Sequence, residues 1–262
     1  MATSPEYTPS EMMAARASQE LKDNEIVFVG IGLPNLACNL ARQTHAPKLF
    51  MIYESGAVGT IPTRLPVSIG DPTLVTDSLS IVSQSDIFQL YLQGGLIEVG
   101  FLGGAQIDRF GNINSTVIGD YHNPKVRLPG SGGACEIAIH SQRLLIMMRM
   151  GPRSFVETCD YITSPGHEQQ SKVESKNKGK TRKDFEHPGK GPTTVITNLC
   201  VCEFLEGEMT VTEMYPGVTK EKILENCGWK IKFADQLSMA KPPSTETLRL
   251  LREELDPQKL YL

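Results

Sequence analysis

Three consecutive segments near the N-terminus constrain the fold more than any other part of this sequence. Residues 25–30 are rich in β-branched side chains and predict a strand. The next segment predicts a helix with Leu36, Leu40 and Ala41 on one face, and the apolar run at residues 49–53 predicts a second, buried strand. A strand, a helix and a strand at this spacing form a βαβ unit, whose strands run parallel. The sequence therefore predicts an α/β protein with an open, largely parallel or mixed sheet flanked by helices.

Glu54 directly follows the second predicted strand, where the apolar run ends and a flexible run of small residues begins at Ser55. In open α/β sheets, ligands bind beyond the carboxyl ends of the strands, so Glu54 is a candidate for chemistry. A solvated rim residue or a partner of a helix dipole is the commoner role for such a glutamate. Position alone leaves both interpretations open.

The charge balance argues against a polyanionic partner. Lys and Arg number 26 against 30 Asp and Glu, which gives a net charge of −4, and aromatic residues make up 6% of the chain. Such a chain offers neither a field that attracts nucleic acid nor a stacking platform for bases. No run approaches the ~20 apolar residues of a membrane span, and residues 1–10 lack a basic segment followed by an apolar one. We expect a cytoplasmic protein with no membrane and no nucleic-acid partner.

The cysteines do not form a recognisable metal-binding pattern. The six cysteines are scattered, and the close pair Cys200 and Cys202 has neither a second pair nor a histidine spacing that would complete a zinc site. Buried free thiols of a reducing compartment are the better interpretation, and no metal site is predicted.

Local signals predict the remaining elements. The capping box at residues 8–11, with proline at the first helical position, predicts a helix to about Leu21. Gly30 and Gly32 follow a strand and open a helix as in a dinucleotide-binding fingerprint, but Asn35 stands where the third glycine is needed, so a tight turn is favoured. The other expected elements are strands at 97–104, 194–196, 200–205 and 209–214, the last three antiparallel, and helices at 135–140, 219–226 and 245–255.

Three further segments bear on function. Residues 112–116 alternate polar with apolar, which predicts one buried face and one face toward a cleft or solvent. The glycine cluster at 130–134 lets the backbone approach a ligand closely, with a flexible surface loop as the alternative. Residues 167–191 carry seven Lys or Arg against four acids and almost no large apolar side chain, which predicts a solvated loop excursion, or else contact with a partner subunit or phosphates. A single domain over residues 1–262 is expected.

Several segments, taken together and in order, carry a resemblance to a known family: residues 54–56, 101–108, 111–116, 118–122, 130–134, 161–166 and 252–257. They resemble the β subunits of family I CoA-transferases, with that of glutaconate CoA-transferase as the expected closest match. The likeness covers nearly the whole chain. It implies the CoA-transferase-like fold, which is related to that of ribose-phosphate isomerase.

The resemblance also implies a mechanism, in which CoA passes between two carboxylic acids by a ping-pong route. Glu54 would be the covalent nucleophile that attacks an acyl-CoA and then carries CoA as a glutamyl thioester. A glutamate in water is already ionised at neutral pH, so no catalytic base is required. Gly132 and Gly133 would offer backbone N–H groups to the oxyanion. Coenzyme A would be a cosubstrate, with no tightly bound cofactor.

The same resemblance implies a partner and a substrate class. A separate α subunit is expected, in a heterotetramer or a larger (αβ)n assembly, because the α half has no counterpart in this sequence. A dicarboxylate such as glutaconate is the expected substrate. The substrate-binding candidates are Ser78, Asn112, Asn114 and His122. Arg64, Asp120, Lys125 and Arg127 could meet a substrate or face solvent.

Two alternatives stay open at this point. A CoA-thioester hydrolase or decarboxylase of the same fold is one, although such relatives lack a glutamate at the position that matches Glu54. A non-catalytic ligand-binding or regulatory protein that keeps the sheet architecture is the other.

Overall fold

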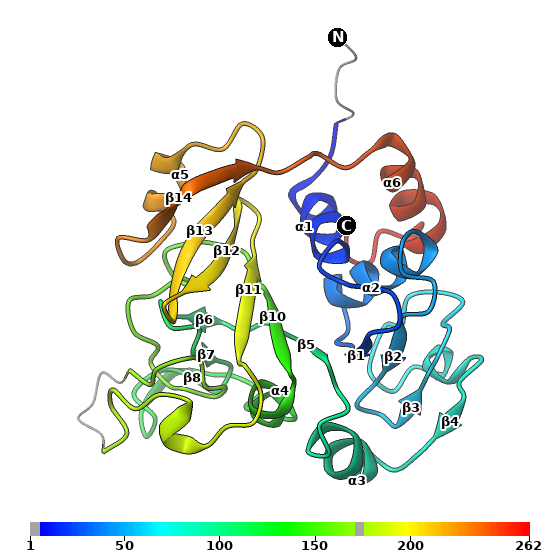
Figure 1. The fold of residues 1–262 in the computed structure, drawn as a ribbon, viewed down its shortest axis with the longest axis horizontal. Helices are drawn as coiled ribbons and strands as arrows, with labels where there is room; N and C mark the ends of the chain where they lie inside the picture. The colour runs from blue at the N-terminus through cyan, green and yellow to red at the C-terminus, as the bar shows by residue number, and fades with distance from the viewer. Residues whose placement is uncertain (1–5, 171–175) are drawn as a thin grey trace. The chain divides into compact units, whose positions relative to one another are not determined.

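The described part of the chain forms two compact units. The computed structural model describes residues 6–170 and 176–262. The first unit comprises Met1–Phe101 with Ala240–Leu262, and the second comprises Leu102–Met239. Figure 1 traces the course of the chain through both. The single domain expected over residues 1–262 stays a prediction.

The first unit contains the predicted βαβ motif. β1 (Ile26–Phe28) pairs in parallel with β2 (Phe50–Ile52), and α2 (Leu33–Gln43) connects the two strands. On its other side β1 pairs in parallel with β5 (Val99–Leu102). One side chain in each of these strands has no exposed surface: Val27, Met51 and Val99. The expected α/β class and the mixed, mostly parallel sheet are therefore confirmed.

The chain between β2 and β5 extends this sheet with short antiparallel strands, in the order β5-β1-β2-β3-β4. The sequence patterns predict no strand or helix there. The elements of this stretch are β3 (Ala57–Val58), η1 (Pro72–Val75), β4 (Ser80–Ile81), α3 (Gln84–Asp86) and the π-helical η2 (Ile87–Leu92), which continues α3.

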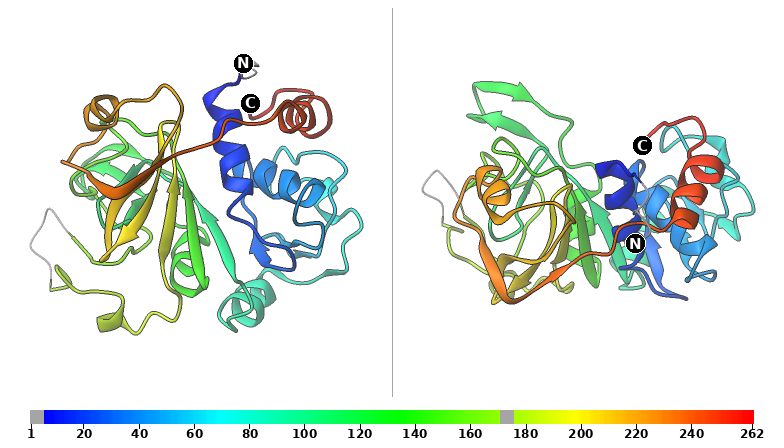
Figure 2. Two further views of the ribbon diagram at one scale, coloured as in Figure 1. Left: turned by 45° about the horizontal axis from the view of Figure 1, so that its top comes forward. Right: turned by 90° about the horizontal axis from the view of Figure 1, so that it is seen from above.

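Two more helical segments complete the first unit. α1 (Pro9–Ser18) begins with the predicted capping box, in which Thr8 and Glu11 each accept a hydrogen bond from the other's backbone N–H. It ends at Ser18, earlier than expected. α6 (Thr245–Arg249) continues as the π-helical η4 (Leu250–Leu255). In Figures 1 and 2, α1 lies beside α2, and η4 also contacts α2. The apolar cluster in this region contains Ala14, Leu36, Leu40, Leu250 and Leu251, with Tyr261 and Leu262 packed against it.

The second unit has its own five strands in the order β14-β13-β12-β11-β10. β10 (Arg143–Met147) and β11 (Pro192–Ile196) are parallel. The expected antiparallel finish is confirmed in β11, β12 (Cys200–Leu205) and β13 (Glu208–Met214). β14 (Lys232–Met239), which pairs in parallel with β13, is not predicted by the sequence patterns.

Shorter elements surround these strands. The predicted helices near 135–140 and 219–226 are present as α4 and α5, and Thr219 caps the second. The bounds of the remaining elements are β6 (Gln106–Ile107), β7 (Ile113–Asn114), β8 (Val117–Gly119), β9 (Pro124–Arg127), α4 (Ala134–His140), η3 (Lys183–Phe185) and α5 (Lys220–Glu225).

The cation-rich segment at 167–191 is not wholly solvated, which corrects the prediction. Arg182 is only 9% exposed. Its guanidinium donates to five backbone carbonyls, including Ala138 O at 3.1 Å and Gly189 O at 3.0 Å. Burial lowers the pKa of Arg182 to about 10. The composition of the segment could not reveal this role of Arg182, because its partners are backbone carbonyl groups, which every residue has. Lys172, another cation of the segment, lies outside the described residues.

None of the six cysteines forms a disulfide, as expected. Four of them are buried as predicted, whereas Cys135 and Cys227 are half-buried. The Sγ atoms of Cys200 and Cys202 are 3.9 Å apart on one side of β12. Across residues 6–170 and 176–262, no cluster of three or more His, Cys, Asp or Glu side chains is arranged to hold a metal ion. Within the same ranges, no helix combines the length and apolarity needed to cross a membrane.

Candidate active site

The backbone before Glu54 is fixed by a buried polar chain. β2 ends at Ile52, and the Tyr53 side chain that follows has no exposed surface. Its hydroxyl accepts a hydrogen bond from the amide of Asn35 on α2. Asn39, one turn later, donates to the Asn35 side chain at 2.9 Å. Because buried polar groups are costly when unpaired, this chain of hydrogen bonds specifies how β2 ends.

Glu54 itself lies in a tight turn between β2 and β3. Gly56 N donates to Tyr53 O, and Tyr53 N donates to Ala57 O, both at 3.0 Å. Gly56 has φ +104°, and a Cβ at this position would lie 2.0 Å from Val82 O. Val82 N donates back to Gly56 O at 3.0 Å. The turn that carries Glu54 is therefore pressed against the backbone that leads into α3, and only glycine fits at the contact.

The Glu54 side chain is half-buried, and one of its oxygens is held. Oε1 accepts a hydrogen bond from Gln84 Nε2 at 3.2 Å. Gln84 is the first residue of α3, and the preceding Ser83 caps the helix by accepting from Asp86 N at 3.1 Å. Sequence reasoning missed Gln84. The signal that could have found it is Ser83 with Asp86 three residues later, which is a helix-start pattern before the apolar residues of η2.

The turn after β1 lies at the same sheet edge as Glu54, because β1 and β2 are parallel. Gly32 forms the N-cap of α2 with φ +96°, and no side chain caps the helix. The tight βα turn preferred from the sequence is therefore present. Asn35, which stands where a dinucleotide fingerprint needs its third glycine, is fully buried and bonded to Tyr53.

The glycine loop belongs to the second unit. Gly130 and Gly132 have positive φ, at +99° and +48°, and open space where a Cβ would be. Gly133 is the N-cap of α4, again without a side-chain cap. Ser131 supports the loop by accepting from Ala134 N at 2.9 Å through its carbonyl and from Cys135 N at 3.2 Å through its hydroxyl. A bulky residue is not excluded by packing there, so the glycines provide backbone freedom rather than close contact. Their role as oxyanion donors stays a prediction.

Asn112 and Asn114 do not face a cleft, which corrects the alternation predicted for residues 112–116. Both are 0% exposed. The amide of Asn112 donates to Asp108 Oδ2 and Glu168 O, each at 2.8 Å, and its oxygen accepts from Gly166 N. The amide of Asn114 donates to Val117 O and to the Gln106 side chain, and its oxygen accepts from two backbone N–H groups. Both side chains use their polar atoms to hold the second unit together, and their role in substrate binding stays a prediction.

Ser78 and His122 lie in different units of the chain. Ser78 lies two residues before β4. The first residue of β4 pairs with Val58, and the next residue pairs with Ala57, which is nearer to Glu54. Strand pairing therefore does not bring Ser78 next to Glu54. His122 is exposed at the turn between β8 and β9, with its ring edge against Tyr121. Backbone N–H groups of this turn, that of Asn123 first and that of His122 second, lower the pKa of Asp120.

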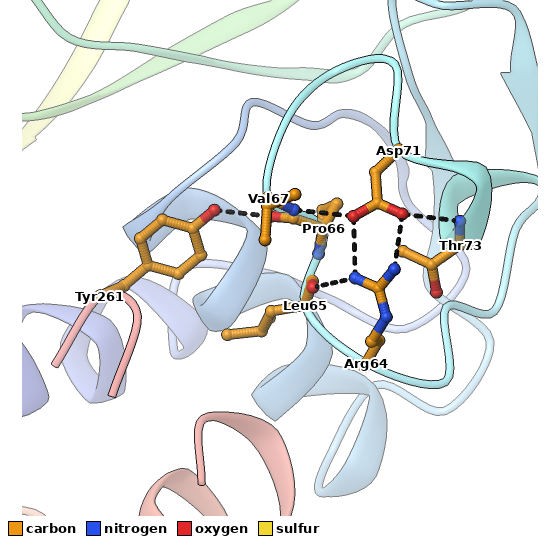
Figure 3. Close-up of polar contacts among 7 residues, drawn as sticks. All are labelled: Arg64, Leu65, Pro66, Val67, Asp71, Thr73 and Tyr261. Atoms are coloured by element: carbon orange, nitrogen blue, oxygen red, sulfur yellow. Dashed lines mark hydrogen bonds and ion pairs between the residues drawn. The ribbon is translucent and has the colours of Figure 1, made fainter. Parts of the chain in front are cut away.

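Arg64 is committed to a structural ion pair. Figure 3 shows its guanidinium facing Asp71, with both bonds at 2.8 Å. Asp71 also accepts from Val67 N and Thr73 N at 3.0 Å, and the Arg64 side chain and these backbone groups hold the pKa of Asp71 well below its usual range. Tyr261 donates from its hydroxyl to Pro66 O at 2.6 Å (Figure 3). The loop after β3 is therefore tied to the chain's last residues, and Arg64 is not free to bind a carboxylate.

A cavity of about 440 Å³ lies within the second unit, at the carboxyl end of β10. Cavities of this size hold small organic ligands. Methionine and glycine give this one an apolar wall, and two arginines give it positive charge. Its lining residues are Gly104, Ala105, Met148, Arg149, Met150, Gly151, Pro152, Arg153 and Ser154.

Comparisons with known proteins agree with this geometry. The sequence pattern of the coenzyme A transferase family matches residues 10–226. The chain is 49% identical over 248 residues to the B subunit of 3-oxoadipate CoA-transferase from Pseudomonas knackmussii, covering 94% of this chain and 92% of that one. It is 35% identical over 269 residues to the B subunit of glutaconate CoA-transferase from Acidaminococcus fermentans, covering 100% and 97%. The crystal structure of glutaconate CoA-transferase from that organism matches with a TM-score of 0.87 at 33% identity, covering 99% and 98%.

The chain belongs to the coenzyme A transferase family. It is a CoA-transferase subunit with the fold of the glutaconate enzyme, as the resemblance implied. The expected ranking of relatives needs correction, because identity to the 3-oxoadipate enzyme is higher than identity to the glutaconate enzyme.

Proposed function

We propose that this chain is the β subunit of a two-subunit CoA-transferase that moves CoA from an acyl-CoA to 3-oxoadipate, with Glu54 carrying the CoA. The acid is taken from the relative that is 49% identical over 94% of the chain, and it replaces glutaconate. Both acids are dicarboxylates, so the substrate class inferred from the sequence is kept. The observation that carries the proposal is the position of Glu54, on a rigid turn beyond the end of β2 with one oxygen bonded and the other unpaired within the described residues.

The first half-reaction makes an acid anhydride and then a thioester. Glu54 Oε2 attacks the thioester carbonyl of the acyl-CoA, and the CoA thiolate leaves, which gives a mixed anhydride. The thiolate then attacks Glu54 Cδ and expels the acyl group as a free carboxylate that takes Oε2 with it. The product is a glutamyl-CoA thioester.

The second half-reaction reverses these steps with the acceptor. The carboxylate of 3-oxoadipate attacks Glu54 Cδ and releases the thiolate, and the thiolate attacks the acceptor's carbonyl carbon in the new anhydride. Acyl-CoA leaves and one acceptor oxygen restores the Glu54 carboxylate. No proton must be moved by a general base in either half. The hydrogen-bond partner of Glu54 agrees with this, because the amide of Gln84 is not a base.

Two features support the other parts of the proposal. Backbone N–H groups of Gly132 and Gly133, which directly precede α4, are suited to stabilise the oxyanion, and one such donor is typically worth about 3 kcal/mol. The first unit also exposes many large apolar side chains between β3 and β5, which suits contact with an α subunit. They are Ile61, Val67, Ile69, Val75, Leu79, Ile81, Leu90 and Leu96.

The experiment uses the chain together with the subunit that co-purifies with it. Succinyl-CoA and 3-oxoadipate are mixed with the assembled enzyme, and both CoA esters are followed by chromatography. The expected result is one 3-oxoadipyl-CoA formed for each succinate released, with no more than one succinate released per active site when 3-oxoadipate is left out. Loss of succinyl-CoA over many turnovers without an acceptor would instead indicate a hydrolase or decarboxylase, and the absence of any exchange with a panel of carboxylic acids would indicate a binding protein.

A further inference from the structure

Gln84 is the side chain that touches the reacting carboxylate, and nothing in the proposed chemistry above uses it. Its Nε2 lies 3.2 Å from Glu54 Oε1. The amide group can donate two hydrogen bonds and cannot take up a proton from the carboxylate. It therefore differs in kind from a general base, and its chemistry is limited to orienting or stabilising an oxygen.

Both ends of this contact are held by backbone. On one side, the Glu54 turn is locked to the segment before α3 by the Val82–Gly56 hydrogen bond at 3.0 Å. On the other side, Ser83 caps α3, and Ile87 at the start of η2 is completely buried. The helix is further fixed by packing of the Phe88 ring against Phe28 on β1, with the two ring centroids 5.8 Å apart. The contact is therefore made between two anchored segments of the same unit.

We propose that Gln84 is a catalytic residue: its amide selects Oε2 of Glu54 as the attacking oxygen and then stabilises the negative charge that forms on Oε1. This inference rests on the proposed function of Glu54. Because Oε1 already accepts from the amide, Oε2, which has no hydrogen bond within the described residues, is the more nucleophilic oxygen. Once Oε2 has entered the anhydride, Oε1 is the carbonyl oxygen of Cδ, and it still faces the same N–H donor.

The electron balance of the next step places charge on that oxygen. When the thiolate attacks Cδ, the C–S bond forms, and the pair of the C=O bond moves onto Oε1. When the C=O bond re-forms, the bond from Cδ to Oε2 breaks, and Oε2 leaves with the product carboxylate. In the resting carboxylate the negative charge is shared by two oxygens, whereas in the tetrahedral intermediate it is all on Oε1. The Gln84 hydrogen bond is therefore stronger in the transition state than in the ground state, which is the condition for catalysis.

The size of the effect follows from the exposure of the contact. Removing one oxyanion donor from a buried site typically lowers kcat by about 100- to 1,000-fold. Gln84 is exposed on the isolated chain, and it also binds the ground-state carboxylate, which offsets part of the gain. We therefore expect a loss of about 10- to 100-fold in kcat for Gln84→Ala, with little change in KM for the CoA ester.

The test uses the assembled enzyme and two readouts. Steady-state kcat and KM are measured with succinyl-CoA and 3-oxoadipate. The glutamyl-CoA thioester is formed by mixing enzyme with succinyl-CoA alone, and is trapped with borohydride at short times. Gln89→Ala is the matched control, because Gln89 is an exposed glutamine on the same continuous helix without a contact to Glu54. Gln84→Glu keeps the length of the side chain but replaces the N–H donors by a second negative charge.

We expect thioester formation to be slow in both Gln84 variants, and Gln84→Glu to be at least as slow as Gln84→Ala. Gln89→Ala is expected to form the thioester at the rate of the unchanged enzyme. Thermal unfolding midpoints are expected to agree among all four proteins, which separates loss of chemistry from loss of fold. Thioester formation in Gln84→Ala or Gln84→Glu at the rate of the control overturns the role of Gln84. If the unchanged enzyme gives no trapped thioester, the proposed role of Glu54 fails instead, so the two failures are distinguishable.

Discussion

Replacing Gly56 by alanine tests how tightly the Glu54 turn must be held. The new Cβ would lie 2.0 Å from Val82 O, so the two backbone segments must separate by roughly 1.4 Å or more before normal contact is restored. This movement removes the Val82 N–H to Gly56 O hydrogen bond of 3.0 Å, which contributes about 1 kcal/mol. Overpacking adds about 1–3 kcal/mol, and an alanine at φ +104° adds about 1–3 kcal/mol.

We therefore expect Gly56→Ala to lower the free energy of unfolding by about 3–7 kcal/mol. Gly95→Ala is the matched control, because Gly95 also has positive φ, at +79°, but has open space where the Cβ would be. The control carries only the backbone cost of about 1–2 kcal/mol. Guanidinium unfolding of the two variants measures the difference.

Activity gives a second readout of the same perturbation. A displacement of about 1 Å at a reacting group can lower the rate by about 100-fold. We expect this loss in kcat for Gly56→Ala, because Glu54 is two residues away in the same turn, and no loss for Gly95→Ala. Equal stability and equal kcat for the two variants would refute the argument that contact with Val82 positions Glu54.

Three further predictions concern the buried side chains of Asp108 and Arg182 and the half-buried Tyr261. Burial raises the pKa of Asp108 from 3.8 to about 7, so the folded chain keeps a proton that the unfolded chain releases. Stability should fall from pH 4 to pH 7 by at most about 4 kcal/mol, and Asp108→Asn should remove this slope in urea titrations. Arg182→Met should lower the free energy of unfolding by roughly 3 kcal/mol, because five carbonyls lose their donor. The control Lys183→Met changes the exposed neighbouring residue and should cost under ~0.5 kcal/mol. Tyr261→Phe removes the bond to Pro66 and should cost about 1 kcal/mol, with faster proteolysis of the loop after β3; an unchanged cleavage rate would contradict that tie.

Local signals were enough to predict much of the fold. The capping box at Thr8 and Glu11 and the apolar run at 49–53 each depend on neighbours in the sequence, and the corresponding helix and strand are present. β14 could not be found in this way. Its residues are half-buried or exposed without a clear alternation, and its position depends on backbone pairing with β13.

The site shows the same division between near and distant partners. Glu54 could be singled out because the end of a strand is visible in the sequence. The burial of Asn114 could not be predicted from the sequence. Its amide donates a hydrogen bond to the Gln106 side chain, and this bond forms only once the fold has buried both residues. Gln84 is 30 residues from Glu54, and only the antiparallel strands between them bring the two side chains together.

Chemical trapping of Glu54 tests the central claim most directly. The assembled enzyme is incubated with succinyl-CoA in the absence of an acceptor, treated with borohydride and digested, and the peptide that contains Glu54 is analysed by mass spectrometry. We predict that the Glu54 side chain is reduced from a thioester to an alcohol, and that Glu54→Gln gives neither the modified peptide nor turnover. An unmodified Glu54 peptide from an enzyme that transfers CoA normally would contradict the covalent role of Glu54.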